Sequence, residues 1–174
     1  MRKAPVPRDE QRRLQILRDY QILDTAAEKV FDDITSLAAD VCNAPICLLT
    51  FVDADRQWFK SNVGLAVKET SREYSFCSHA LLETDIFIVP DARADERFAD
   101  NPLVTGEPSI RFYAGVPLRT PEGAAVGTLC VIDREPRHLT KQQLDKIKAL
   151  AASAVLLLEM RRARPPQRSD NSAT

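Results

Sequence analysis

The stretch ICLLTFVDADRQWFKSNV, residues 46–63, decides how the remainder of the sequence is to be interpreted. Residues 46–52 are apolar at nearly every position, and the polar segment Asp53–Arg56 separates them from residues 57–63. This pattern predicts two strands joined by a short turn. A strand that is apolar on both faces is typical of the centre of a covered sheet. We therefore expect a hairpin here, with its first strand in the interior of a sheet.

Two helices are predicted before this hairpin. Residues 8–23 combine strong helix formers with a short apolar stripe. Residues 28–43 place apolar side chains at spacings of three and four and end at Asn43, before Pro45. We expect the second of these helices to bury one face.

The segments after the hairpin predict further strands and a long loop. Ser75 suits the N-cap of a short helix that ends near Leu82, and a strand is expected over residues 86–92. Residues 93–109 are polar and exceed the length of ordinary connections, so we interpret them as a candidate lid. Strands over residues 110–118 and 126–133 flank a TPEG turn and close the sheet.

The last helix carries a clear start signal and a wide apolar arc. Thr140 and Gln143 form a capping box. A seam follows at spacings of three and four, widened by neighbouring apolar positions; the seam residues are Leu144, Ile147, Ala151, Ala154 and Leu158. We expect one side of Leu144–Leu158 to pack on the sheet and the other on the same helix of a second subunit. The alternative is a single broad core face.

Composition limits the classes of partner. Lys and Arg number 24 against 25 Asp and Glu, a formal net charge of -1, so we expect neither nucleic acid nor a membrane surface as partner. No apolar run reaches the ~18–20 residues of a membrane span. The four cysteines lack the dense spacing of a disulfide scaffold, which favours reduced thiols and a cytoplasmic location.

The order of predicted elements is an α+β plan with one antiparallel sheet. Five stretches make it more specific; they are VDADRQWFKSNVGL (52–65), SFCSHAL (75–81), IVPDARADERFADNPLVTG (88–106), IRFYAGVPLRTPEG (110–123) and VGTLCVIDREPRHLT (126–140). Together they resemble the GAF domain, a sensory module of bacterial signalling proteins with a PAS-related fold. The resemblance covers about residues 10–160, with a flexible N-terminus at 1–9 and a disordered basic and polar tail at 161–174.

The resemblance implies a particular arrangement. We expect a central six-stranded antiparallel sheet with the N- and C-terminal helices packed on one face and forming a dimer. On the other face we expect a small-molecule pocket beneath the short helix and the long loop. The ligand and any cofactor stay unidentified, because a family fixes the place of a pocket better than its chemistry.

Cys77 and His79 lie two positions apart in a chain with four Cys and two His, so a catalytic pair, half a metal site and a buried turn are the alternatives. Metal binding needs further ligands, which the scattered cysteines and His138 do not supply, so we expect no metal. A thiol at a helix start has a lowered pKa, but positions two apart point to different sides of a helix, so spacing alone does not pair Cys77 with His79 as nucleophile and base. The expected role of both is to line the pocket.

Other side chains complete the expected ligand site. Trp58 and Phe59 alternate in their strand, so one ring faces the core and the other faces the helices or a pocket, with core packing as the default interpretation for both. Arg111 and Tyr113 share one face of their strand, where they suit a binding cavity; an ion pair of Arg111 with Asp91 is the structural alternative. Asp53 and Asp55 are interpreted as turn formers rather than calcium ligands. The predicted ligand-binding residues are Trp58, Cys77, His79, Asp91, Arg111 and Tyr113.

These observations predict a non-enzymatic sensory domain of bacterial signal transduction, which acts through dimeric terminal helices. Its expected partners are a small-molecule ligand and a kinase or cyclic-di-nucleotide enzyme in trans. Two alternatives stay open. One is a thiol reductase of the free methionine sulfoxide reductase type, in which Cys77 acts on a small oxidised substrate, although residues 93–109 hold no partner cysteine. The other is a structural dimerisation module.

Overall fold

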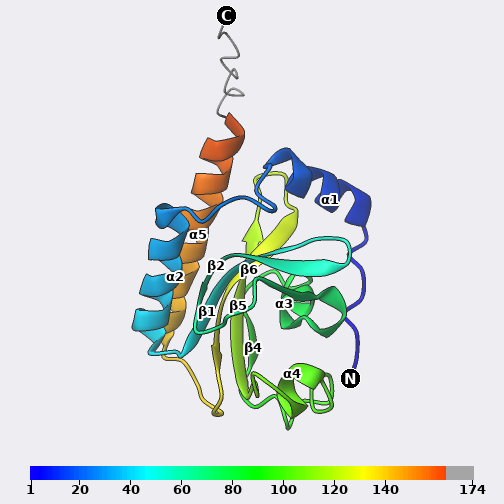
Figure 1. The fold of residues 1–174 in the computed structure, drawn as a ribbon, viewed down its shortest axis with the longest axis vertical. Helices are drawn as coiled ribbons and strands as arrows, with labels where there is room; N and C mark the ends of the chain where they lie inside the picture. The colour runs from blue at the N-terminus through cyan, green and yellow to red at the C-terminus, as the bar shows by residue number, and fades with distance from the viewer. Residues whose placement is uncertain (164–174) are drawn as a thin grey trace, which may run out of the picture.

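The computed structural model describes residues 1–163, which form one six-stranded antiparallel sheet with helices on both faces (Figure 1). The strand order is β3-β2-β1-β6-β5-β4. The strands are β1 (Ile46–Val52), β2 (Arg56–Val63), β3 (Glu69–Ser71), β4 (Phe87–Val89), β5 (Phe112–Arg119) and β6 (Ala125–Asp133). The α+β fold and the six-stranded sheet expected from the sequence are confirmed.

Strand β1 lies in the interior of the sheet, as its unbroken apolar run predicts. It pairs with β2 on one side and with β6 on the other, and all seven of its residues are buried. Its register with β2 shifts after Leu49, so that Ser61 pairs with Leu49 and Phe59 pairs with Thr50. Lys60 lies between these two pairs and has no partner in β1, which marks a bulge beside the helix-covered face.

The helices α1 (Glu10–Asp19), α2 (Lys29–Cys42) and α5 (Lys141–Ala163) contribute to the core on one face of the sheet. Figure 1 shows α2 and α5 side by side along this face. The seam predicted for the last helix is mostly turned inward, because Ile147, Ala151, Ala154 and Leu158 are buried in the same apolar cluster as Phe51 and Trp58. We call this side the helix-covered face.

Shorter elements cover the opposite side, which we call the pocket face. They are the 3-10 turn η1 (Arg72–Tyr74), α3 (Phe76–Ala80), α4 (Pro102–Thr105) and the connecting segments around them. Phe76 stacks on Phe98, with ring centroids 4.0 Å apart, and lies 5.3 Å from the Tyr113 ring. A second apolar cluster therefore holds this face together without a long helix.

The predicted start signals of both helices are confirmed. The Ser75 hydroxyl accepts a hydrogen bond from the Ser78 amide at the start of α3, at 3.1 Å. At α5 the Thr140 hydroxyl accepts from the Gln143 amide, and the Gln143 side chain accepts from the Thr140 amide.

Several boundaries differ from the sequence-based expectation. The first helix is shorter than residues 8–23, because the chain turns through left-handed conformations at Gln21 and Asp24. Strand β3 was not predicted, since its three residues carry no apolar periodicity. The 93–109 segment holds helix α4, which Asn101 caps by accepting from the Leu103 amide.

The two predicted ends also differ in part. Residues 1–9 lie across the pocket face, where the Arg2 amide donates to the Arg97 carbonyl. Helix α5 continues to Ala163, so the first residues of the predicted 161–174 tail are helical. The remainder of that predicted tail lies outside the described residues. None of the described helices has the length and apolarity needed to cross a membrane.

Candidate functional site

A small cavity lies beneath α3 on the pocket face, where the sequence places a ligand pocket. Its volume is ≈ 30 Å³, and residues from β1, β2, α3, α4 and β5 contribute to its walls. Among the lining residues are Gln57, Phe59, Ser75, Phe76, Cys77 and Tyr113. This volume holds one or two waters, so a larger ligand requires α3 or the loop before β5 to move outward.

A polar cluster around Cys77 borders this cavity. The Cys77 sulfur accepts hydrogen bonds from the Tyr113 hydroxyl at 3.2 Å and from the Thr128 hydroxyl at 3.0 Å. The Cys130 sulfur lies 3.9 Å away. All of these side chains are buried, so the cluster is isolated from bulk water in this conformation.

The pKa values of the side chains in this cluster are shifted in opposite directions. Burial would raise the pKa of Cys77, but the hydrogen bonds from Cys130, Thr128 and Tyr113 outweigh burial and lower it. Burial, together with Cys77, raises the pKa of Cys130 and of Tyr113 well above their ordinary values. The Cys77 sulfur therefore accepts the hydrogen bonds of the cluster, and its pKa lies below that of Cys130.

His79 points away from this cluster, as the helical spacing predicts. Its Nε2 donates to the Arg2 carbonyl at 3.1 Å, and its ring packs against Phe98 at 4.8 Å. Burial lowers its pKa. The structure does not bring His79 and Cys77 together as a nucleophile and base.

Trp58 lies on the helix-covered face, where it stacks on Phe51 with ring centroids 6.4 Å apart. Phe59, the next residue of β2, points to the pocket face and lines the cavity. Alternation along the strand thus selects Phe59 as the pocket aromatic, and Trp58 is not near the other predicted site residues.

Asp91 and Arg111 lie outside the cavity and do not form the ion pair offered as the structural alternative. Asp91 binds Arg93 instead, accepting from its backbone amide and its guanidinium. Arg111 donates to the carbonyls of Val104 and Ile110, at 2.8 and 3.0 Å. Of the six predicted residues, the structure brings Cys77 and Tyr113 together at the cavity.

Sequence reasoning missed Gln57, Ser75 and Cys130 as parts of this site. Ser75 donates a hydrogen bond to the Gln57 side chain, which ties the start of α3 to β2. Gln57 carried a usable signal, because it lies two positions from Phe59 and therefore on the same face. Cys130 carried no such signal, because its approach to Cys77 depends on how α3 sits on β6.

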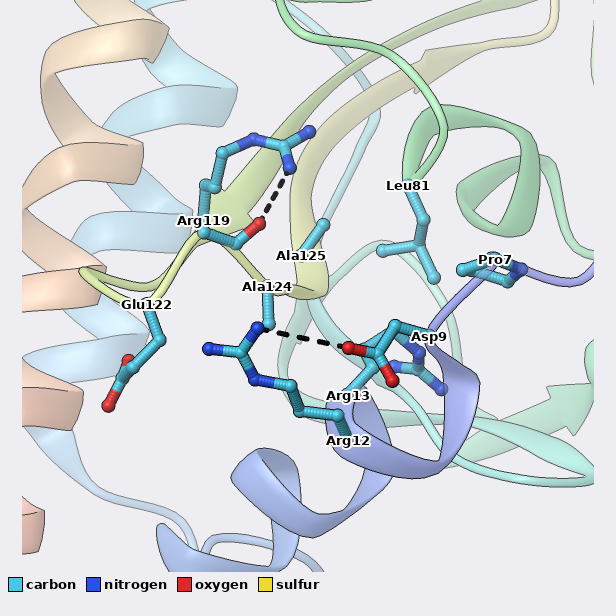
Figure 2. A pocket seen from close by; sticks show the side chains of 10 residues that line it. Pro7, Asp9, Arg12, Arg13, Leu81, Arg119, Glu122, Ala124 and Ala125 are labelled. Carbon is cyan, nitrogen blue, oxygen red and sulfur yellow. Dashed lines mark hydrogen bonds and ion pairs between the residues drawn. The ribbon is translucent and has the colours of Figure 1, made fainter.

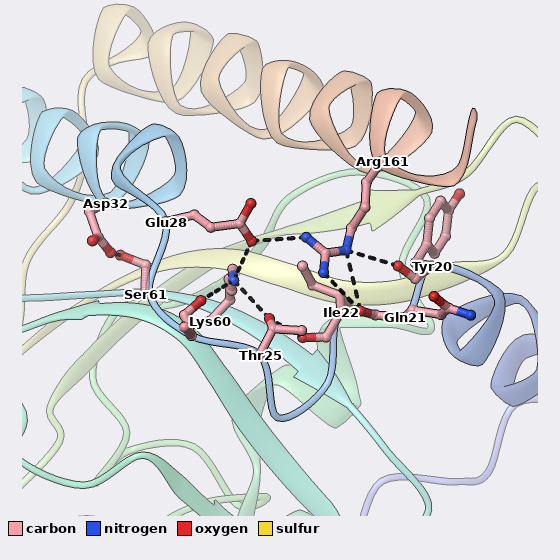
Figure 3. A network of polar contacts seen from close by, with 10 residues as sticks. Tyr20, Gln21, Ile22, Thr25, Glu28, Asp32, Lys60, Ser61 and Arg161 are labelled. Carbon is pink, nitrogen blue, oxygen red and sulfur yellow. Dashed lines mark hydrogen bonds and ion pairs between the residues drawn. The ribbon is translucent and has the colours of Figure 1, made fainter. Parts of the chain in front are cut away.

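A polar network on the helix-covered face joins β2 to the end of α5 (Figure 3). The fully buried Lys60 ammonium donates to the Thr25 hydroxyl at 2.8 Å and the Ala26 carbonyl at 2.6 Å, and it pairs with Glu28 at 2.6 Å. Arg161 binds the same Glu28 carboxylate at 3.0 Å. Glu28 thus connects a strand of the sheet with the last turns of α5.

Arg161 also holds the segment between α1 and α2. Its guanidinium donates to the carbonyls of Tyr20 and Gln21, both at 3.1 Å. Burial would raise the pKa of Glu28, but the hydrogen bond and charge of Lys60, together with Arg161, lower it. The carboxylate is therefore ionised at neutral pH, and the network stays intact.

Asp53, one of the two predicted turn formers, behaves as a turn residue. The Asp53 carboxylate accepts from the Ala54 amide at 2.8 Å. No cluster of three or more His, Cys, Asp or Glu side chains within residues 1–163 is arranged to hold a metal ion.

The chain belongs to the GAF domain family, whose profile matches residues 26–158. A Pseudomonas aeruginosa protein named cyclic di-GMP phosphodiesterase is 47% identical over 137 residues, which are 79% of this chain. This chain spans only 23% of the length of that relative, which therefore carries other regions besides the matching one. The similarity supports a signalling GAF domain.

Many solved structures share the fold. The GAF domain of an Acinetobacter phosphoenolpyruvate-protein phosphotransferase matches with a TM-score of 0.60 and 18% identity, over 86% of this chain and 94% of that one. A free methionine-R-sulfoxide reductase from Neisseria meningitidis, in complex with its substrate, matches with a TM-score of 0.61 and 14% identity, over 84% and 87%. At these identities the likeness concerns the fold alone.

Proposed function

We propose that this GAF domain is a regulatory sensor whose cavity beneath α3 opens for a small ligand and whose helix α5 transmits the result. The observation that carries the proposal is the alternation of β2. Gln57 and Phe59 line the cavity on one face, and Lys60 begins the Glu28–Arg161 network on the other. A displacement of β2 therefore acts on both sites at once.

The β2 bulge gives this strand freedom to respond. Lys60 has no partner in β1 and is held by side chains and by the segment before α2. A ligand that enters the cavity displaces Phe59 and, with it, the neighbouring Lys60. Because Glu28 binds both Lys60 and Arg161, this displacement also changes the position of Arg161. Two arrangements of this network, with different affinity for the ligand, are what a population shift requires.

Hydrogen exchange on the full chain tests this coupling. We expect Phe59→Ala to increase exchange within residues 20–28 and in the last turns of α5, because it loosens β2 at the cavity. The matched control is Phe98→Ala, which removes a buried ring of the same face that does not line the cavity and reaches it only through its stack on Phe76. Equal exchange of these segments in both variants would contradict the coupling.

Native mass spectrometry of protein purified from its own host identifies the ligand. A retained small molecule gives an excess mass, and we expect that mass to be lost in Phe59→Ala and kept in Phe98→Ala. A mass retained equally by both variants would place the ligand elsewhere than the cavity beneath α3.

A homodimer through α2 and α5 forms part of the proposal. Two apolar side chains of α5 stay largely exposed, Leu156 at 64% and Met160 at 57%, and α2 exposes Leu37 at 51%. Light scattering is expected to show a dimer that Leu156→Ser with Met160→Ser converts to monomer. The matched control is Leu82→Ser, an exposed apolar residue just after α3; a dimer that survives the double change would overturn this interface.

The output partner is proposed from the relative. Because that relative is named as a cyclic di-GMP phosphodiesterase, we infer that this domain regulates a cyclic-di-nucleotide enzyme or a kinase, in trans or within a longer chain. Adding the purified domain to such a phosphodiesterase should change its turnover. The Phe59→Ala variant should alter that change if the cavity controls the output.

The Cys77–Cys130 pair favours a second candidate function, a thiol-dependent sulfoxide reductase. In this reaction the Cys77 thiolate attacks the sulfur of a small sulfoxide whose oxygen takes up a proton. The substrate S–O bond breaks as the hydroxyl group moves to the Cys77 sulfur, so that the thioether leaves and Cys77 becomes a sulfenic acid. The Cys130 thiol then attacks the Cys77 sulfur, and water leaves as the disulfide forms. Residues 93–109 hold no second thiol. Cys130, whose sulfur lies 3.9 Å from that of Cys77, takes this place in the proposed reaction.

A single-turnover assay with free methionine sulfoxide separates the two functions. A reductase loses two thiols and two mass units per methionine formed, and Cys130→Ser stops at the sulfenic acid. The control Cys42→Ser removes a buried thiol on the other face and should behave like the parent. No methionine from the reduced parent protein would remove this candidate and leave the sensor.

A further inference from the structure

The side chains around the cavity beneath α3 carry no formal charge. None of its lining residues, all of which lie within residues 1–163, is an Asp, Glu, Lys, Arg or His. Most of the lining is apolar and includes Leu48, Phe59, Phe76, Leu103, Ile110 and Ile132. An ionised group that entered this cavity would lose its hydration without meeting an opposite charge, which is costly.

A cleft elsewhere in the molecule has the opposite character, as Figure 2 shows. Its volume is ≈ 160 Å³, and Asp9, Arg12, Arg119 and Glu122 are among its lining residues. The cleft and the cavity beneath α3 share no lining residue. A test of ligand charge must therefore follow signals that belong to the cavity itself.

Two side chains form a polar position in the otherwise apolar lining. Gln57 of β2 and Thr70 of β3 are directly paired across the sheet, so their side chains lie next to each other on one face, and both line the cavity. The Thr70 hydroxyl oxygen is buried and has no hydrogen-bond partner within residues 1–163. A buried hydroxyl without a partner is destabilising, so a partner is expected beside it.

The amide of Gln57 adds donors at the same position. Its oxygen accepts a hydrogen bond from the Ser75 hydroxyl, whereas its nitrogen forms no hydrogen bond within residues 1–163. The other polar groups of the lining are paired with each other. The Tyr113 hydroxyl donates to the Cys77 sulfur at 3.2 Å, and Ser75 binds both Gln57 and the Ser78 amide. The Gln57 nitrogen and the Thr70 hydroxyl are thus the donors left for a ligand.

We propose that the cavity beneath α3 takes an uncharged molecule that combines an apolar body with a hydrogen-bond acceptor, such as the carbonyl oxygen of an amide or ketone. The acceptor binds the Gln57 amide nitrogen and the Thr70 hydroxyl, and the body lies against Phe59 and Phe76. A few polar groups that orient a mostly apolar ligand are typical of small-molecule sites. The inference rests on the proposed function, because such a ligand enters only if the cavity opens.

This ligand class differs from two molecules that the proposed function brings to mind. A cyclic dinucleotide, the substrate in the name of the Pseudomonas aeruginosa relative, carries charged phosphates. Free methionine sulfoxide is a zwitterion at neutral pH. Both bring ionised groups that the lining of this cavity leaves without a partner.

An NMR titration of the full chain with three probes of similar size tests the proposal. Benzamide is uncharged and has a carbonyl acceptor, benzoate carries a charge, and toluene has no acceptor. The readout is the side-chain N–H signals of Gln57. We expect benzamide to shift them with a millimolar or tighter dissociation constant, benzoate to bind there at least about tenfold more weakly, and toluene about fivefold more weakly.

The outcomes separate this inference from the proposed function. Benzoate that binds at Gln57 as tightly as benzamide would refute the uncharged class and leave the sensor intact. Equal affinities for toluene and benzamide would refute the polar position. If no probe shifts the Gln57 signals, the cavity holds water only and does not open, and the pocket of the proposed function fails together with this inference.

Thr70→Val assigns the acceptor contact. The change keeps the shape of the side chain, and it lies in a partly exposed edge strand, so the fold should persist. We expect benzamide to bind about fivefold more weakly and toluene to bind unchanged. The matched control is Thr120→Val, which removes a buried hydroxyl after β5 that does not line the cavity. Equal benzamide affinities in the two variants would overturn the role of Thr70.

Discussion

The two faces of the sheet are built differently, although the same strands form both. The helix-covered face carries two long helices, α2 and α5, over a continuous apolar cluster. The pocket face carries short helices of four and five residues, a cavity and a buried cluster of hydroxyl and thiol groups. One face has the features of a fixed core, and the other has the features of an adjustable site.

This difference follows from the lengths of the segments. A long amphipathic helix buries a continuous stripe, so each of its turns stabilises the next one. A helix of one turn, such as α3, depends on its cap and on contacts with the sheet. Functional elements are commonly drawn from the less stable parts of a fold, which agrees with a pocket on this face.

The largest expected effect compares one phenylalanine from each face. Phe51→Ala removes a fully buried ring beneath α2 and α5, and we expect a loss of about 3–5 kcal/mol in the free energy of unfolding. Phe59→Ala enlarges a cavity that already exists and that is closed on one side by the short helices α3 and α4, so its loss should be smaller by about 1 kcal/mol or more. Urea denaturation measures both values.

Equal losses in these two variants would break the comparison, because the pocket face would then be as rigid as the helix-covered face. Leu156→Ala serves as the control, since this side chain is exposed and is expected to change the free energy of unfolding by no more than about 0.5 kcal/mol. A dimer that buries Leu156 would increase this small effect with protein concentration.

The sequence predicted the helix-covered face better than the pocket face. Apolar periodicity places Phe31 on the buried side of α2 and Ile147 on that of α5, because burial of a helix stripe is a local property of the sequence. Strand alternation left open which of Trp58 and Phe59 faces the pocket. That choice depends on which side of the sheet the helices cover.

Contacts within the pocket face were beyond sequence reasoning for a related reason. Cys77 meets Cys130 from 53 positions away, and the contact depends on how a single-turn helix sits on β6. Asp91 binds its near neighbour Arg93 rather than Arg111, because a carboxylate in a turn reaches adjacent donors at lower entropic cost. Local patterns predict elements, whereas such pairs follow from tertiary packing.

A second prediction uses the pH dependence of the helix-covered face. Lys60 and Arg161 lower the pKa of Glu28 below its ordinary value of 4.5, so Glu28 contributes stability above that pH and loses it as the pH falls through the folded-state pKa. We expect Glu28→Gln to be less stable than the parent at neutral pH, and the difference to shrink as the pH falls below 4.5. Urea denaturation across this range gives the two curves.

Glu107→Gln is the matched control, because Glu107 forms no ion pair within residues 1–163. Its curve should run parallel to that of the parent chain. If Glu28→Gln also runs parallel, the Lys60–Glu28–Arg161 network contributes nothing that depends on ionisation, and the proposed connection between β2 and α5 loses its electrostatic basis.

The smallest expected effect on the free energy of unfolding tests whether the pocket face can open while the helix-covered face stays folded. Ser75→Ala removes the hydroxyl that caps α3 and that donates to Gln57, and we expect a loss of about 1 kcal/mol. Hydrogen exchange should increase in α3 and leave α2 and α5 unchanged. Ser71→Ala, which removes the weaker and exposed cap of η1 at 3.3 Å, is the control for losing a hydroxyl nearby.

The pattern of exchange matters more here than the size of the loss. An increase confined to α3 means that this helix opens without unfolding the domain, which is what a ligand larger than the ≈ 30 Å³ cavity requires. An increase spread equally over α2 and α5 means that both faces unfold as one unit. Ligand entry would then require global unfolding, because the pocket face could not open independently of the helix-covered face.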